Sequence, residues 1–305
     1  MPLEFTCPHC RGRTLVDDKF LGHTGPCYQC GKTVTVPLVP EEDAVQVERR
    51  RDRSRRLWWS SILVVVAGLF TALVTTAIVV MFVWPLIGST RAIAHRATCT
   101  TNLRSISLAL RAYHDRHGEY PPPYLVDTNG KPMHSWRVLI LPELGEHELY
   151  SQYKFNEPWD GPNNFKLHMR MPAVYGCPTD PSNVTRSDTS YVAIVGGKTM
   201  FPQRGKRRVG DVRDGEANTL LVVESHESGI PWTAPRDIPF SSLSLGVNGA
   251  QKSGIFGHHD DGAQGVTVDG QVHHLDGTAD PAALESLSTV SGGDSSDWTR
   301  VERGP

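Results

Sequence analysis

The sequence predicts an α+β protein with a small cysteine-rich head, one transmembrane helix and a larger C-terminal domain. Three observations predict this order: two CxxC pairs near the N-terminus, no charged residue from Leu57 to Thr90, and one amphipathic helical pattern followed by strand-like segments. We therefore expect a zinc ribbon at 1–36, a basic linker at 37–56, a transmembrane helix at 57–88 and a periplasmic domain at 89–305.

The overall composition excludes several classes of protein. The chain has 305 residues, of which 21% are charged and 39% hydrophobic, and its formal net charge is −2. This composition is not that of a wholly disordered chain or a disulfide-dense mini-protein. A near-neutral charge also disfavours nucleic-acid binding by the whole chain.

The head contains four cysteines in two CxxC pairs, and these are Cys7, Cys10, Cys27 and Cys30. Two such pairs supply four thiolates to one tetrahedral Zn²⁺, with Gly12 and Gly31 as the flexible residues after each pair. Phe5–Thr6 and Thr33–Val36 are expected to be the flanking strands. Two disulfides or a redox CxxC are the alternatives, which a reducing compartment and the absence of a βαβ pattern disfavour.

The head also contains residues that we do not expect to bind metal or nucleic acid. His9 and His23 could ligate a metal, but four cysteines already complete a tetrahedral shell. The basic residues of the head are balanced by acidic ones, so nucleic-acid binding is not expected. A unit this short cannot build an adequate core alone, so metal binding would stabilise its fold.

The uncharged stretch is long enough to span a bilayer as a helix. Trp58, Trp59 and Trp84 lie near its ends, where indole side chains favour the membrane interface. A buried core helix or a cleaved signal peptide is the alternative, but the stretch is too long for the first and too far from the N-terminus for the second.

The flanking charges predict the orientation of this helix. Arginines crowd its N-terminal side, namely Arg49, Arg50, Arg51, Arg53, Arg55 and Arg56, whereas Arg91 and Arg96 lie on the other side. Because positive charge stays in the cytoplasm, we expect a single-pass inner-membrane protein with a cytoplasmic N-terminus. Binding of the basic cluster to nucleic acid or anionic lipid is the alternative.

The C-terminal domain should begin with a helix and continue with an antiparallel sheet. Leu103, Ile106, Leu110 and Tyr113 recur at helical spacing, and Gly118 begins the stop signal. Short helices are expected at Ser135–Leu141, Gly145–Tyr153, Asn163–Met169 and Asp280–Leu287. Strands are expected at Ser190–Val195, Thr219–Glu224, Gln264–Val268 and Gln271–Leu275, the last two joined by a two-residue turn at Asp269 and Gly270.

This part of the chain resembles a family that is abundant in planctomycete bacteria, the prepilin-like domain-of-unknown-function family 1559. The matching segments are Cys99–His114, Gly118–Pro122, Ser135–Pro142, Leu149–Tyr153, Cys177–Pro181, Ser190–Gly196, Asp214–Thr219 and the closing H-x(9)-D-G motif at His259, Asp269 and Gly270. The resemblance implies a pilin-like domain, in which a long helix packs on an antiparallel sheet. No prepilin cleavage site precedes Leu57, so a permanently anchored relative is expected. The head is similar to the zinc ribbons that precede membrane spans in proteins of the same bacteria.

Two further groups of residues are candidates for chemistry. Cys99 and Cys177 would lie in an oxidising compartment, where a disulfide is expected and two unpaired cysteines are the alternative. Histidines and aspartates gather near the last hairpin, namely His258, His259, Asp260, Asp261, His273 and His274. They could hold a divalent metal, but we expect His259 to hydrogen-bond the turn at Asp269 instead.

The expected function is therefore binding rather than catalysis. Nucleophile elbows, P-loops, dinucleotide fingerprints and HExxH are absent. We expect a non-enzymatic, membrane-anchored, pseudopilin-like protein with an assembly or scaffold role and protein partners at the inner membrane or envelope. A transmembrane sensor that couples a periplasmic ligand to a cytoplasmic partner is the first alternative, and a metal-dependent hydrolase is the second.

Overall fold

The computed structural model describes residues 2–38, 41–182, 187–249, 254–259, 262–293 and 297–302. The chain forms two compact units, Met1–Pro85 and Leu86–Pro305. One long helix, α1 (Glu41–His117), contributes residues to both units. The predicted basic linker is therefore helical from Glu41 onward.

The head consists of two antiparallel hairpins. Strand β1 (Leu3–Thr6) pairs with β2 (Arg13–Val16), and β3 (Thr24–Pro26) pairs with β4 (Thr33–Thr35). A short 3-10 helix, η1 (Asp18–Phe20), lies between the hairpins. Among the described residues of the head, the buried apolar core comprises Phe5, Cys7 and Val36, with a few half-buried neighbours. This core is too small to stabilise such a unit without a further contribution.

The uncharged stretch lies within α1. Its segment Trp58–Phe82 is long and apolar enough to cross a membrane, with a mean hydropathy of 2.6 and none of its apolar window buried in the protein. Large side chains such as Phe70 and Leu73 are about two-thirds exposed. A helix that is apolar all round and unburied is compatible with lipid contact.

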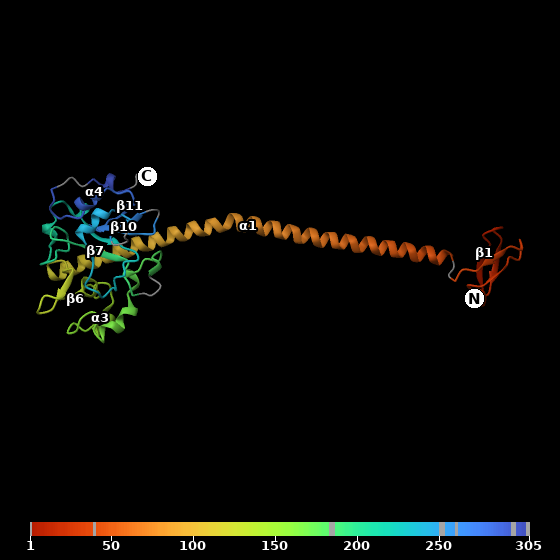
Figure 1. Cartoon of the computed structure of the whole chain (residues 1–305), viewed down its shortest axis with the longest axis horizontal. Coiled ribbons are helices and arrows are strands. Elements are labelled where there is room, and N and C mark those ends of the chain that lie inside the picture. Colours follow the sequence, from red (N-terminus) through yellow and green to blue (C-terminus); the bar gives the residue numbers. More distant parts are fainter. Residues whose placement is uncertain are drawn as a thin grey trace. The chain divides into compact units, whose positions relative to one another are not determined.

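The C-terminal unit is built on a five-stranded sheet of order β11-β10-β8-β7-β9 (Figure 1). Its strands are β7 (Tyr191–Val195), β8 (Leu220–Glu224), β9 (Ile238–Pro239), β10 (Gly262–Thr267) and β11 (Val272–Asp276). All neighbours are antiparallel except β7 and β9. The four predicted strands are confirmed, and β9 was not predicted because two residues carry no periodic signal. A separate hairpin joins β5 (Tyr124–Val126) to β6 (Pro132–Ser135).

Short helices surround the sheet, and the four predicted ones are present. The α-helices are α2 (Trp136–Leu139), α3 (His147–Gln152) and α4 (Pro281–Ser286). The 3-10 helices are η2 (Asn164–Arg170), η3 (Ala173–Tyr175), η5 (Val209–Asp211), η6 (Glu216–Asn218), η7 (Phe240–Leu245) and η8 (Trp298–Arg300). The fold class is therefore mixed α+β.

Both faces of the sheet are buried, in two separate apolar clusters. The first contains the α1 residues Leu103, Ile106 and Leu110, which are fully buried, together with Tyr191 and Val266 from the sheet. Figure 1 shows the last turns of α1 passing beside the strands of this unit. The second cluster contains the opposite side of the sheet, the helix α4 and η7. The predicted core stripe of the helix is thus confirmed.

The turn between β10 and β11 differs from the prediction. The backbone N–H of Thr267 donates to the carbonyl of Gln271, so three residues, Val268 to Gly270, form the loop. Gly270 has a φ of +89°, the left-handed conformation that ends a three-residue hairpin loop. The hairpin was predicted, but its two-residue turn was wrong.

Candidate functional site

The four head cysteines converge on one point. Their Sγ atoms all lie within 4.8 Å of one another. The Cys7 and Cys30 sulfurs are 3.9 Å apart, and those of Cys10 and Cys27 are 3.8 Å apart. Zn–S bonds of about 2.3 Å at a tetrahedral angle place sulfurs ~3.8 Å apart. The cluster therefore has the geometry of a site that could hold a metal ion.

The backbone follows the same path around both cysteine pairs. In both knuckles the residue four positions after the first cysteine donates its N–H to the carbonyl of that cysteine: Arg11 to Cys7 and Gly31 to Cys27. Both residues have positive φ, 57° and 70°. The strained position of the first knuckle is thus Arg11 and not Gly12. Backbone N–H groups of Cys30 and Gln29 lower the pKa of Cys27 to about 6, which favours the thiolate that binds metal.

An apolar groove lies beside the cysteine cluster. It has a volume of about 380 Å³, and Phe5, Val16, Phe20 and Tyr28 are among its lining residues. The side chain of Tyr28, inside the second CxxC pair, is 91% exposed. The head therefore presents an aromatic side chain and an apolar groove next to its candidate metal centre.

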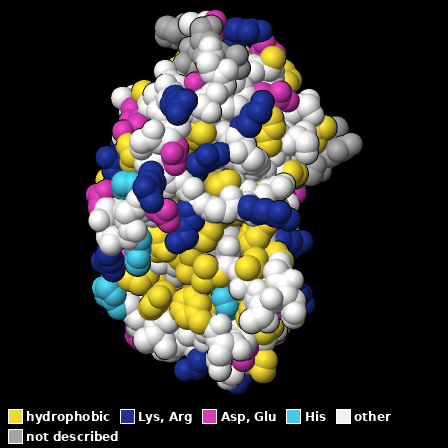
Figure 2. Space-filling view, turned by 90° about the vertical axis from the view of Figure 1, so that its left-hand side faces the viewer, with side chains coloured by type: hydrophobic (Ala, Val, Ile, Leu, Met, Phe, Trp, Pro, Cys, Tyr) yellow, Lys and Arg dark blue, Asp and Glu magenta, His cyan; other side chains and the backbone are white. Residues whose placement is uncertain are grey.

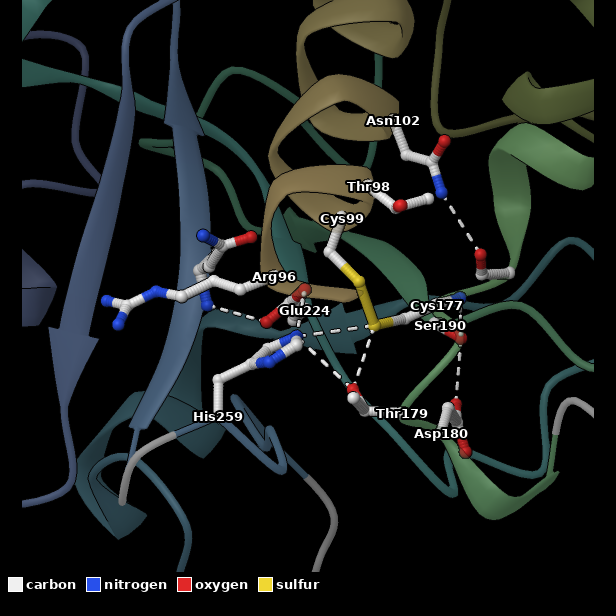
Figure 3. Close-up of a disulfide and its surroundings, with 12 residues drawn as sticks. Arg96, Thr98, Cys99, Asn102, Cys177, Thr179, Asp180, Ser190, Glu224 and His259 are labelled. Carbon is white, nitrogen blue, oxygen red and sulfur yellow. Dashed lines mark hydrogen bonds and ion pairs between the residues drawn. A yellow bond between two sulfur atoms is a disulfide. The ribbon is translucent and has the colours of Figure 1, made fainter. Parts of the chain in front are cut away.

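In the C-terminal unit, a disulfide joins Cys99 of α1 to Cys177 (Figure 3). Their Cα atoms are 5.4 Å apart and their residues are separated by 78 positions. Both cysteines are fully buried. The bridge therefore fixes the first buried turn of the helix to the segment before β7.

His259 contacts this disulfide and a buried carboxylate. Its Nε2 atom lies 3.3 Å from the Cys177 Sγ atom, 3.3 Å from the Thr179 Oγ1 atom and 3.4 Å from the Glu224 Oε1 atom. Figure 3 shows these side chains pointing toward one another. The predicted hydrogen bond of His259 to Asp269 is wrong, because Asp269 instead accepts from Thr267 and the backbone of Gln271. The sheet places the turn at the far end of β10 from His259.

Glu224 is completely buried, yet its pKa is lowered. Desolvation raises its pKa, but the side chains of His226 and His259 outweigh this effect and lower the pKa below its ordinary value. Its Oε2 atom accepts from the backbone N–H of Gln264 at 2.7 Å. Its Oε1 atom faces the two imidazoles, at 3.4 Å from the Nε2 atom of His259 and 3.9 Å from that of His226. Glu224 was missed in the sequence because it ends an ordinary strand pattern.

A pocket opens onto this cluster. It has a volume of about 580 Å³ and is lined by Ala92, Ile93, Arg96, Ala97, Thr100, Thr179, His258 and His259. One wall is therefore α1, and the opposite wall contains two residues that touch the Cys177 sulfur. All of these residues belong to the C-terminal unit.

The other histidines of the predicted cluster do not join this site. His258 is 2.9 Å from a carboxylate oxygen of Glu227, and His273 is 2.7 Å from one of Glu302. His273 also stacks on Trp298. Asp260 and Asp261 lie outside the described residues. Within the described part of the chain, His258 and His273 therefore have separate partners and do not form a shared metal site.

One of three comparisons with known proteins gave a match. No curated protein and no solved structure matches this chain. A family model described as "Protein of unknown function (DUF1559)" matches residues 88–237, which include the buried part of α1, the disulfide and strands β5 to β8. The resemblance noted in the sequence is therefore confirmed for this segment: residues 88–237 match the DUF1559 family, whereas the motif residues His259, Asp269 and Gly270 lie beyond the match.

Proposed function

We propose that this chain is a non-enzymatic, single-pass protein of the inner membrane. In this proposal it has a cytoplasmic zinc ribbon and a periplasmic pilin-like domain, and it binds protein partners in the cell envelope. The observation that carries the proposal is the four-cysteine cluster, which precedes a helix segment able to cross a membrane.

Zinc is the metal that best suits the head. Four sulfur ligands with sulfur–sulfur distances of 3.8 and 3.9 Å suit its tetrahedral, thiolate-rich structural sites. A site closed by four protein ligands has no open position for a substrate or water, which supports a structural role. The small core of the head needs additional stabilisation, and metal binding would supply folding free energy.

Partner binding by the head is supported by its exposed apolar groups. Tyr28 is 91% exposed and Leu15 is 70% exposed, and the groove of about 380 Å³ lies between the two hairpins' apolar residues. Tyrosine is enriched at protein interfaces because it supplies a large contact area with little loss of conformational entropy. The head therefore docks a protein rather than a nucleic acid.

The arrangement of the C-terminal unit supports a pilin-like domain. The buried face of α1 packs in one cluster with a mainly antiparallel sheet. Figure 2 shows apolar side chains exposed on one face of the molecule between Lys and Arg side chains. Such a mixed surface suits contacts with other envelope proteins.

The orientation follows from the arginine cluster before the apolar segment. It agrees with the chemistry of the cysteines. Free cysteines in the head favour a reducing compartment, whereas the disulfide of the C-terminal unit favours an oxidising one.

A pull-down from detergent-solubilised membranes tests this function. The intact chain is compared with a Cys7→Ser/Cys10→Ser variant, with Tyr28→Ala, and with His9→Ala as the matched control. We expect the intact chain and His9→Ala to recover the same envelope proteins. The cysteine variant should lose zinc and also lose the proteins that bind the head. If Tyr28→Ala keeps zinc but no longer recovers the proteins that bind the head, the groove is the docking surface. Recovery of an identical set of proteins by all four chains would contradict docking by the head.

A second candidate function is a transmembrane sensor, and the pocket of about 580 Å³ favours it. One wall of this pocket is α1 itself, so an occupant would contact the same helix that contains the apolar segment. Replacing Ala97 by Trp would fill the pocket from that wall. A sensor predicts that Ala97→Trp changes the partners recovered with the head, and a scaffold predicts no change there.

A further inference from the structure

Four potential metal ligands of three chemical types converge in the C-terminal unit, and this convergence does not depend on the proposed function. They are Cys99, Cys177, Glu224 and His259, with ligand atoms all within 4.8 Å of one another. None is more than 4% exposed. We propose that reduction of the Cys99–Cys177 bond converts this cluster into a buried site for a zinc-class divalent cation.

The distances already present are those between ligands of a tetrahedral site. The Cys177 Sγ to His259 Nε2 distance is 3.3 Å, and the Glu224 Oε1 to His259 Nε2 distance is 3.4 Å. Zinc bonds of about 2.3 Å to sulfur and about 2.0–2.1 Å to nitrogen and oxygen place such ligand pairs ~3.3–3.6 Å apart at a tetrahedral angle. After reduction the two sulfurs must separate to a comparable spacing by rotation of their side chains. His259 and Glu224 need little movement.

The electrostatics of the cluster also favour a cation. Glu224 is fully buried, and its Oε1 atom, which has no hydrogen bond to any residue that the structure describes, lies 3.4 Å from the His259 Nε2 atom. Two thiolates next to this carboxylate would be unstable in a dry interior without a positive charge among them. A divalent cation supplies that charge and takes neutral His259 as its fourth ligand.

The surroundings hold the ligands in place. The backbone N–H of Gln264 fixes Oε2 of Glu224, which leaves Oε1 turned toward His259. The backbone N–H of Cys177 donates to the Ser190 hydroxyl at 2.9 Å, and that hydroxyl donates to Asp180 at 2.8 Å. Such supporting bonds orient the ligands of metal sites in proteins.

The pocket beside the cluster supplies a route to it. His259 and Thr179 line this pocket of about 580 Å³, and both contact the Cys177 sulfur. A hydrated cation or a small thiol can therefore approach within one side chain of the bridge. Full burial of the sulfurs means that local opening is needed for reduction.

The chemistry balances with a dithiol as the reductant. One thiolate of the dithiol attacks a bridge sulfur, the bond between Cys99 and Cys177 breaks, and the second thiol completes the exchange. The bridge gains two electrons and two protons, and the dithiol becomes a disulfide. When the cation binds, both thiols release their protons to water.

Metal analysis of the full chain in detergent tests this site with zinc alone. The chain is purified in air or throughout in dithiothreitol, loaded with zinc and desalted. The state of Cys99 and Cys177 is read by alkylation and mass spectrometry. We expect about one zinc per oxidised chain, from the head, and about two per reduced chain. Exchange with Co²⁺ should add a second set of thiolate absorption bands only in the reduced chain.

Variants distinguish this site from the head and from nonspecific binding. His259→Ala and Glu224→Gln should each lower the affinity for the second zinc ion. The loss should exceed the ~10–100-fold that is typical of removing a residue that supports a ligand. His258→Ala, at the neighbouring position with its own carboxylate partner, should retain it. Each variant must keep the disulfide when oxidised and one zinc in the head, which shows that it is folded. One zinc in both redox states, a second zinc that survives His259→Ala and Glu224→Gln, or a bridge that resists dithiothreitol would each overturn the proposal.

Discussion

The Nε2 atom of His259 lies 3.4 Å from the Oε1 atom of Glu224, and both side chains are buried against a disulfide. Glu224 ends strand β8, whereas His259 lies three positions before Gly262, the first residue of β10, its neighbour in the sheet. A buried carboxylate is tolerated only when it is paired and hydrogen-bonded. The pairing of these two residues is therefore part of the packing that joins the sheet to the bridge.

The stability of the C-terminal unit should depend on the ionisation of Glu224. Its pKa is lower in the folded chain than in the unfolded one, because the imidazoles of His226 and His259 outweigh desolvation. This contribution is fully present above the unfolded pKa of about 4.3 and is lost as the pH falls through the lower folded pKa. Urea unfolding from pH 7 to pH 3 is expected to show a constant stability difference between the parent chain and Glu224→Gln above about pH 5.

Below about pH 4 the difference should shrink, because the parent chain then also carries an uncharged side chain. A difference that stays the same from pH 7 to pH 3 would show that charge at this position does not contribute. Glu227→Gln, at a half-buried carboxylate beside His258, is the matched control and should change the stability less than Glu224→Gln.

Removal of the disulfide should destabilise the C-terminal unit. The disulfide closes a long loop between residues separated by 78 positions. The double variant Cys99→Ser/Cys177→Ser is expected to lose about 2–5 kcal/mol of unfolding free energy under oxidising conditions. Guanidinium unfolding measures this loss. Under reducing conditions the unfolding free energy of the parent chain should approach that of the variant. A difference in unfolding free energy that persists there would mean that serine disturbs packing instead.

The buried ion pair of Arg137 and Asp237 gives a third prediction. The Arg137 Nη2 atom is 2.5 Å from the Asp237 Oδ1 atom, and both side chains are at most 1% exposed. The guanidinium also donates to the carbonyl of Tyr191, and Asp237 accepts from the backbone N–H of Ala193. Asp237→Ala leaves a buried positive charge unpaired and should lower the unfolding free energy by about 3–5 kcal/mol.

The double variant Arg137→Met/Asp237→Leu removes both charges and should recover part of this loss, as urea unfolding can measure. Desolvation of Asp237 is large enough that its pKa is raised even beside Arg137. If the double variant is less stable than Asp237→Ala, the hydrogen bonds to Tyr191 and Ala193 matter more than the burial of charge.

The sequence predicted the regular elements well because their signals are local. The stripe Leu103, Ile106 and Leu110, the four main strands and the cysteine pairs each repeat at a spacing that one stretch of chain determines. The resemblance to the family also anticipated the match at residues 88–237.

The candidate site in the C-terminal unit was harder to predict, because it depends on contacts across the chain. Glu224 and His259 are 35 positions apart, and only the pairing of β8 with β10 brings their ends together. The carboxylate had no sequence signal, and the motif residues His259 and Asp269 suggested a contact that the sheet does not allow. Similarly, the loop length at Gly270 depends on the strand register, which a two-residue turn signal does not determine.

Metal removal should unfold the head and leave the C-terminal unit folded. The described residues of the head have a buried apolar core of Phe5, Cys7 and Val36, whereas the C-terminal unit has two large clusters. Treatment of the full chain with a zinc chelator is expected to abolish amide protection within residues 2–36, as hydrogen exchange can measure. His23→Ala should not change zinc content, since the ring of His23 contacts the backbone of Leu21 and not the cysteines. Retained protection after complete metal loss would contradict this dependence.

Gly270 gives the last prediction, because its backbone conformation favours glycine. Its φ is +89°, and an added Cβ would meet nothing closer than the Ser107 hydroxyl at 3.6 Å. Steric overlap is therefore absent, and the expected loss in Gly270→Ala, about 1–2 kcal/mol, comes from the left-handed backbone alone. Gly197→Ala is the matched control, since Gly197 also has open space around its Cβ position but no positive φ. Thermal unfolding should show a lower midpoint for Gly270→Ala only. Equal midpoints for the two variants would show that the loop at Val268–Gly270 can change its conformation at no cost, so that the hairpin does not require glycine there.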